Sequence, residues 1–172
     1  MAATGQLKLR QANVQSAQNS LLGARRKLQK AEQKAQTTAA SAAKFEKEYR
    51  ELCAHPLIKR VEVQGEQVTI RTNTITIDYR GERYVIGEFK IFFNGSGDVS
   101  FLNRHRHVDT WRRAWDHPNV VNTHPTRHSF VVRIAGLLAK RDYKLATELC
   151  MKYLTSYRTG EPGISISTWP RL

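Results

Sequence analysis

The side chains best suited to chemistry are concentrated in residues 115–128, which read WDHPNVVNTHPTRH. A histidine titrates near neutral pH and can transfer a proton, so a segment rich in histidine is chemically suggestive. His117, Pro118 and Asn119 follow one another in this segment. The pattern makes it a candidate active site, provided that a nucleophile lies close by.

A suitable nucleophile is missing from the segment. The two cysteines of the chain, Cys53 and Cys150, lie far from it in sequence, each in a helix-like context. Ser129 is the only serine nearby, and a serine hydroxyl is a weak nucleophile unless a base activates it. We expect no catalytic constellation in this segment. Because the two cysteines are far apart and lie in helix-like contexts, we expect both to be free, buried thiols. Such thiols favour an intracellular, cytoplasmic location.

A histidine cluster raises the alternative of a metal site. Five histidines fall within 24 residues. Two histidines separated by one residue on a strand would point to the same face, where both rings could bind one zinc ion. The weak candidate ligands are His105, His107 and His117. Two features argue against a metal site. Few carboxylates lie nearby to complete or orient the set of ligands, and the arginines between the histidines would repel a cation. We expect no metal and no other cofactor.

Arginine and tryptophan side chains occupy the same region. Trp111 and Trp115 are four residues apart with two arginines between them, as on one turn of a helix. Guanidinium groups beside indoles suit phosphate contacts and base stacking, and they equally suit a protein interface. Alternatively, both tryptophans fill the core beneath this segment. The candidate binding residues are Arg104, Arg106, Trp111, Arg112, Arg113, Trp115 and Arg127.

The N-terminal third is predicted to be one long helix. Between Gln6 and Leu52 there is no proline and one glycine, and good helix formers dominate. Apolar residues recur every seven positions, with mostly small residues three positions after each, which is the a/d seam of a coiled coil. The seam begins with Leu7, Val14, Leu21 and Leu28.

Such a helix would be roughly 65–70 Å long, which exceeds what a domain of about 120 residues can cover. We expect its C-terminal half, around Phe45, Tyr49 and Leu52, to pack on the domain. The N-terminal half then needs a partner, either another copy, a different helix or an acidic surface. We accordingly divide the chain into a projecting basic helix, residues 1–43, and a domain, residues 44–172.

The charge of the chain points to acidic partners. The formal net charge is +13, and no acidic residue precedes Glu32. Nucleic acid is therefore a candidate partner. A membrane partner is not expected, because no apolar run approaches the roughly 20 residues that span a bilayer. The N-terminus also lacks the apolar segment of a secretory signal.

The remaining sequence predicts an α+β domain. Alternating apolar residues and glycine-containing turns indicate an antiparallel β-meander of four to five strands in sequence order. An irregular polar stretch follows, from about residue 104 to residue 129. Helices, broken near residues 140–142, should then pack on one sheet face, and residues 164–172 should form an extended tail. The strand-like segments are 58–63, 67–72, 74–79, 83–93 and 98–103.

This order of elements, with HPNV just past the last strand, resembles the ubiquitin-conjugating-enzyme fold and its non-catalytic RWD relatives over about residues 40–172. The segments VIGEFKIFF, VSFLN, HPNV, KYLTSYRTGEPG and the WP tail are more closely similar to small bacterial and phage ubiquitin-conjugating-like proteins. The resemblance implies that Asn119 would support an oxyanion and that His117 would hold a turn. It also implies a nucleophilic cysteine about ten residues after the histidine, near Arg127.

No cysteine stands there, and thioester transfer needs a thiolate. We therefore expect a non-catalytic pseudoenzyme. Its predicted function is that of an interaction or scaffold protein that forms a homo- or hetero-oligomer through the N-terminal helix and docks a protein partner. One alternative is a nucleic-acid-associated protein that binds phosphates through the basic helix and the Arg/His/Trp segment. A second is a conjugating enzyme with a relocated cysteine, for which Cys150 is the candidate.

Overall fold

The computed structural model describes residues 2–94, 96–110, 113–160 and 163–172, with side chains described from Gln15 onward except Ala17. The chain divides into two compact units, residues 1–46 and 47–172. The helix α1 (Ala2–Cys53) runs through the first unit and enters the second. The long N-terminal helix predicted from the heptad pattern is therefore confirmed.

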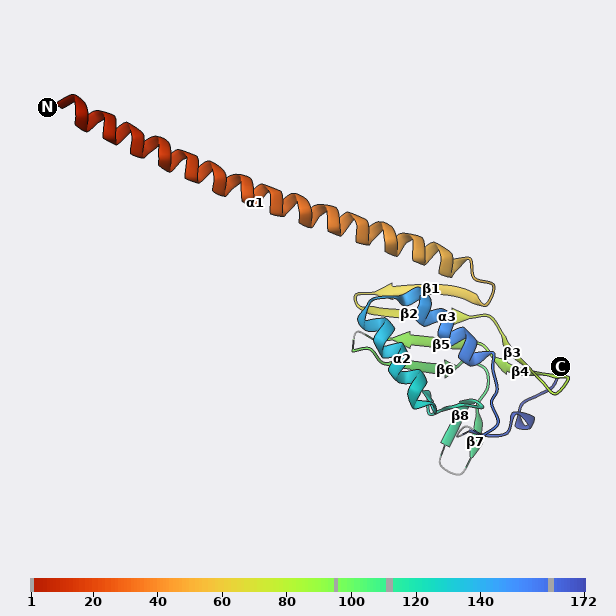
Figure 1. The fold of residues 1–172 in the computed structure, drawn as a ribbon. Coiled ribbons are helices and arrows are strands. Elements are labelled where there is room, and N and C mark those ends of the chain that lie inside the picture. Colours follow the sequence, from red (N-terminus) through yellow and green to blue (C-terminus); the bar gives the residue numbers. More distant parts are fainter. Residues whose placement is uncertain (1, 95, 111–112, 161–162) are drawn as a thin grey trace. The chain divides into compact units, whose positions relative to one another are not determined.

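The second unit is built on a four-stranded antiparallel sheet in the order β1-β2-β5-β6 (Figure 1). Alternate residues of β5 and β6 are buried, among them Ile91 and Phe101, and Ile70 of β2 is buried beside them. This alternation places one face of the sheet in the core, as period-two patterning requires. The strands are β1 (Ile58–Gln64), β2 (Gln67–Thr72), β5 (Phe89–Phe93) and β6 (Val99–Asn103).

The predicted meander is correct in its antiparallel pairing but wrong in placing all the segments in one sheet. β3 (Ile75–Tyr79) and β4 (Glu82–Gly87) follow β2 and precede β5 in the sequence, but they form a separate hairpin. The segment predicted as one strand, residues 83–93, breaks at Gly87, whose φ of 134° is available almost only to glycine. The break redirects the chain and takes the hairpin out of the main sheet.

The stretch predicted to be irregular forms a second antiparallel sheet, in the order β10-β9-β8-β7. The sequence conceals this sheet because its strands are short and its pattern is interrupted by polar side chains that turn out to be buried. Asp116 is one of them, at 3% exposure. The strands are β7 (Val108–Thr110), β8 (Arg113–His117), β9 (Val120–Val121) and β10 (His124–Pro125).

Two helices, α2 (His128–Ala139) and α3 (Tyr143–Leu154), cover one face of the main sheet (Figure 1). The predicted break between them is confirmed. Asp142 caps α3 by accepting a hydrogen bond from the backbone N–H of Leu145 (3.1 Å). Apolar residues on both helices, such as Ile134 and Leu154, are fully buried against the sheet.

The tail, predicted to be extended, begins with a short 3-10 helix, η1 (Ile166–Thr168). Trp169 follows and is 2% exposed. The last residues pair with β4, because Pro170 accepts a hydrogen bond from the N–H of Val85 and Leu172 donates one to Arg83. The tail therefore anchors the hairpin that leaves the main sheet.

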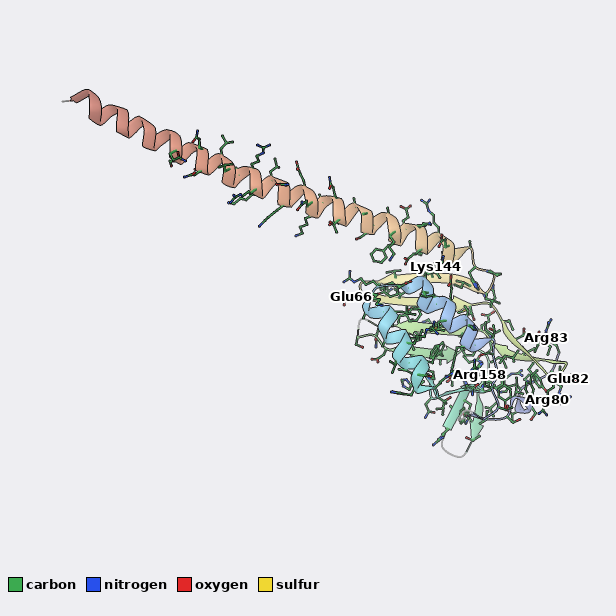
Figure 2. The ribbon with its side chains drawn as sticks, in the orientation of Figure 1. Glu66, Arg80, Glu82, Arg83, Lys144 and Arg158 are labelled. Atoms are coloured by element: carbon green, nitrogen blue, oxygen red, sulfur yellow. The ribbon has the colours of Figure 1, made fainter. Side chains whose placement is uncertain are left out.

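The last turns of α1, residues 47–53, pack within the second unit. Leu52 is buried in the core, whereas the side chains of Tyr49 (46%) and Phe45 (37%) are exposed, so of the three predicted packing residues only Leu52 is buried. Lys144 of α3 contacts Glu51 at 2.6 Å, and Figure 2 labels Lys144 at this end of the domain. This pair raises the pKa of Lys144 and lowers the pKa of Glu51, chiefly through their hydrogen bond.

Candidate functional site

The histidine-proline-asparagine segment forms a buried turn between two strands. β8 ends at His117 and β9 begins at Val120. The Nδ1 atom of His117 accepts a hydrogen bond from the backbone N–H of Asn119 (3.0 Å). Its Nε2 atom therefore carries the proton and donates to the carbonyl oxygen of Leu154 (3.0 Å). The imidazole ties the turn to the C-terminal end of α3.

The imidazole of His117 is held neutral by its surroundings. The side chain is completely buried, and burial lowers its pKa to about 4, an effect that the hydrogen bond to Leu154 only partly offsets. Both ring nitrogens already have partners. A buried neutral ring without a free nitrogen has neither a proton nor a lone pair to offer a substrate, so its geometry is that of a structural tie.

The backbone carbonyl of Asn119 fixes the other side of the turn. It accepts a hydrogen bond from the hydroxyl of Tyr153 (2.6 Å) and two from Thr126, through its N–H and its hydroxyl (3.0 Å each). The side chain of Asn119 is 3% exposed, and its Nδ2 has no hydrogen-bond partner among the described residues. The amide therefore lies inside the protein rather than at a surface open to substrate.

The turn is covered by the segment that leads to the tail. The backbone N–H of Ile164 donates to the carbonyl oxygen of Pro118 (3.0 Å). A methyl group at Gly163 would overlap that same oxygen and would lie 3.0 Å from Nδ2 of Asn119. Glycine is therefore required for the close approach of the two backbones.

Two polar residues that the sequence reasoning did not single out, Asp116 and Asn103, also hold this region together. The carboxylate of Asp116 accepts hydrogen bonds from the backbone N–H groups of Asn103 and Thr123 (3.0 Å each). The amide of Asn103 donates to the carbonyl oxygens of Asp116 (2.9 Å) and Ile86 (2.8 Å). This network joins β6, β8 and the end of β4. The usable sequence signal was a polar residue, Asn103, at an inward position of an alternating strand.

The position where the resemblance places a nucleophile offers no thiol. Arg127 stands there, half-buried, and its Nε donates to the hydroxyl of Ser129 (3.1 Å). A guanidinium is a cation and cannot activate a hydroxyl as a base. Cys150 is fully buried on α3, and burial raises the pKa of its thiol well above the usual value. Cys53 is exposed at the end of α1, outside the turn, so the expectation of buried thiols is wrong for Cys53.

The predicted Arg/Trp surface is assembled only in part. Trp115 lies on β8 and is 5% exposed, and its indole N–H donates to the hydroxyl of Thr110 (3.3 Å). The expectation that it shares a helical turn with Trp111 is wrong, and its buried indole cannot stack on a base. Trp111 and Arg112 lie outside the described residues. Three of the predicted arginines are exposed: Arg104, Arg106 and Arg113.

The weak histidine metal site is not assembled. Over the residues that the structure describes, no group of three or more potential ligands is positioned to hold a metal ion. The proposed set fails because both nitrogens of His117 are engaged in the turn. His105 instead contacts Glu88 (3.3 Å), and His107 is exposed.

A second candidate region is the surface of α1 in the first unit. The heptad positions there are exposed, with Leu21 at 70% and Leu28 at 61%. For Leu7 and Val14 the side chains fall outside the described part of the chain. We call the a and d positions from Leu21 to Ala42 the heptad face: Leu21, Ala24, Leu28, Ala31, Ala35, Thr38 and Ala42.

Basic side chains occupy the opposite side of the same helix. At 100° per residue, Arg26 and Lys30 point away from the heptad face. With Lys27 and two glutamines they line a shallow depression on the helix surface. We call these residues the basic face: Arg26, Lys27, Gln29, Lys30 and Gln33.

Comparisons with protein-family models, with curated proteins and with solved structures found no match to this chain. Among the described helices, none has the length and apolar character needed to cross a membrane. Two features of the chain itself bear on its function. These are a buried turn without a nucleophile and a helix with an uncovered apolar face.

Proposed function

We propose that this chain is a non-catalytic scaffold or interaction protein, similar to ubiquitin-conjugating-like and RWD-like proteins, that assembles through the heptad face of α1. The unit formed by residues 47–172 would dock a protein partner. The single observation that carries this proposal is the exposure of Leu21 and Leu28 at heptad spacing on a 52-residue helix.

Exposure of these leucines has an energetic consequence. Burying a leucine side chain contributes about 2 kcal/mol, so a partner that covers both would gain several kcal/mol from this face. The intervening alanines bury little area each, but they allow a second helix to approach closely. The apolar period of seven is the pattern that favours a helix as this partner.

The buried turn supports the non-catalytic part of the proposal. Its histidine has no free nitrogen, its asparagine amide is buried, and arginine occupies the position of the expected thiol. In this proposal the motif serves the fold, since it links β8, β9, α3 and the C-terminal segment. Its chemistry is therefore hydrogen bonding within the domain.

Replacing both Leu21 and Leu28 by glutamate in the full chain should lower association at least tenfold, because two charges would enter the contact. The measurement is the molar mass by light scattering across a concentration series, together with capture of bound proteins. Leu22→Glu is the matched control, since Leu22 is 54% exposed but lies outside the heptad face. Equal association by all three chains would rule out the heptad face as the contact.

A second candidate function, nucleic-acid association, is favoured by the basic face. Between residues 25 and 34 there are five basic side chains and one acidic side chain, Glu32. Such a cluster would neutralise phosphates without reading bases, so binding would be largely independent of sequence. Within the basic face, Arg26 and Lys30 lie away from the heptad face, whereas Lys27 flanks it. Arg26 and Lys30 could therefore contact phosphates while a second helix covers the heptad face.

The double variant Arg26→Gln, Lys30→Gln should bind a short DNA duplex more weakly. The slope of log affinity against log salt should fall in magnitude by about two, because about one counterion is released per phosphate contact. Fluorescence anisotropy over a salt series measures this slope. Lys140→Gln with Lys152→Gln, two exposed lysines of the second unit, matches the charge change. An identical loss in the two variants, or no binding even at low salt, would exclude the basic face.

A further inference from the structure

We infer that the partner of the heptad face is a second copy of this chain, arranged parallel and in register, with Lys27 of each copy facing Glu32 of the other. This inference rests on the proposed function, and it adds the identity and orientation of the partner. It comes from the charges that flank the heptad face rather than from the apolar positions alone.

The heptad assigns Lys27 to a g position and Glu32 to the following e position. In a parallel two-stranded coiled coil, a g residue lies beside the e residue five positions later on the other helix. Residues 27 and 32 differ by five, and their charges are opposite. Over residues 13–46 this is the one g–e combination in which both residues are charged, so no repulsive pair opposes it.

Neither charge has a partner of its own at helical spacing. The residues three and four positions from Lys27 are Gly23, Ala24, Lys30 and Ala31. Those around Glu32 are Leu28, Gln29, Ala35 and Gln36. Neither set offers an opposite charge at the spacing where side chains meet on one helix. A second copy would therefore supply ion pairs without disrupting any at these positions.

One residue of the heptad face, Thr38, is polar, but its side chain can be buried in a dimer. Thr38 occupies a d position, and its hydroxyl donates a hydrogen bond to the carbonyl oxygen of Lys34 (2.9 Å). A hydroxyl that already has its acceptor adds no unpaired donor when a second helix covers it. The face can therefore close over Thr38 without an unsatisfied donor.

The reverse orientation is less favourable. In an antiparallel pair, g positions face g positions and e positions face e positions. A pair centred near Leu28 would then set Lys27 against Lys34 of the other copy while Arg25 approaches Glu32. The repulsive and attractive contacts would offset each other. Parallel pairing has the attraction alone.

Two cysteine variants of the full chain test the orientation. In a Cys53→Ser background, Ala24→Cys and Ala31→Cys, each made alone, should both give disulfide-linked dimers under mild oxidation. In a parallel, in-register pair, every residue of the seam lies beside the same residue of the other copy. In an antiparallel pair only the residue at the midpoint of the contact does so, and two positions seven residues apart cannot both be at the midpoint. Ala40→Cys, an exposed position outside the heptad face, is the matched control and should remain monomeric on a non-reducing gel.

Charge reversal tests the ion pair. Lys27→Glu should raise the dimer dissociation constant roughly five- to tenfold, since two attractive pairs become repulsive. The double variant Lys27→Glu, Glu32→Lys should restore it to within about twofold of the original chain. Arg26→Glu is the control, because it changes the net charge equally but lies on the opposite side of the helix. Sedimentation equilibrium measures all four chains.

The outcomes separate this inference from the proposed function. If the chain is monomeric at every concentration, yet another protein binds and is lost in Leu21→Glu, Leu28→Glu, the second-copy inference is wrong and the proposed function stands. If a dimer forms but Lys27→Glu behaves like Arg26→Glu, the parallel register is wrong. If neither self-association nor partner binding depends on the heptad face, both fail.

Discussion

Replacing His117 by alanine should lower the free energy of unfolding of residues 47–172 by about 4 kcal/mol. The substitution leaves the N–H of Asn119 and the carbonyl of Leu154 buried without partners, at about 1–3 kcal/mol each, and it opens a cavity. Urea unfolding followed by tryptophan fluorescence measures the effect. All three tryptophans lie within residues 111–169, so the signal reports this unit and not the N-terminal part of α1.

The same residue should make stability depend on pH. The pKa of His117 is about 4 in the folded chain and near 6.5 when unfolded, so between these values the unfolded chain binds the proton more readily. Stability is therefore fully present above pH 6.5 and is lost as the pH falls toward 4. Between pH 7 and pH 5 the loss attributable to this residue is about 2 kcal/mol.

The control for both effects is His107→Ala, which removes an exposed histidine. It should unfold like the original chain at pH 7 and keep the same decline toward pH 5. His117→Ala should lack that part of the decline. A His117→Ala chain with the original stability and the original pH profile would show that the imidazole does not hold the turn.

Replacing Gly87 by alanine should cost about 3 kcal/mol. The new methyl group would lie 2.5 Å from Oδ1 of Asn103, on a residue whose φ of 134° disfavours any side chain. Asn103 cannot move away cheaply, because its amide holds the carbonyls of Ile86 and Asp116. Thermal and urea unfolding of the variant give the size of the loss.

Gly65→Ala is the matched control, since Gly65 also has positive φ (59°) but no atom lies within 4 Å of the added methyl group. It should cost only about 1 kcal/mol, from the backbone conformation alone. Combining Gly87→Ala with Asn103→Ala should cost less than the sum of the two single changes, because they disrupt the same contact. An additive double variant would mean that the clash with Asn103 is not the cause.

The elements with strong periodicity were predictable from the sequence, and those defined by buried polar contacts were not. The heptad predicted α1 because it places apolar residues on one face of a helix. Alternation predicted the main strands because it places apolar residues on the face of the sheet that is buried. The second sheet depends on Asp116, which ties together backbone groups from β6 and the β9–β10 turn. Such a partnership cannot be seen in a pattern of apolar residues.

The candidate site was predicted in position but not in environment. The sequence located His117 and Asn119, yet their burial depends on covering segments more than 30 residues away, around Tyr153 and Gly163. The arginines beside Trp115 favour a surface position, but the alternative that it fills the core is the one that its burial supports. The strand places it inward, and local composition carries no information about that direction.

The most direct test of assembly through α1 is the molar mass of the full chain by light scattering, compared with that of the chain carrying Leu21→Glu and Leu28→Glu. One copy has a mass of 19.7 kDa. We predict a mass of about twice this value for the full chain, falling to that of one copy in the variant. A full chain that stays at the mass of one copy, and that binds the same proteins as the variant, would contradict assembly through the heptad face.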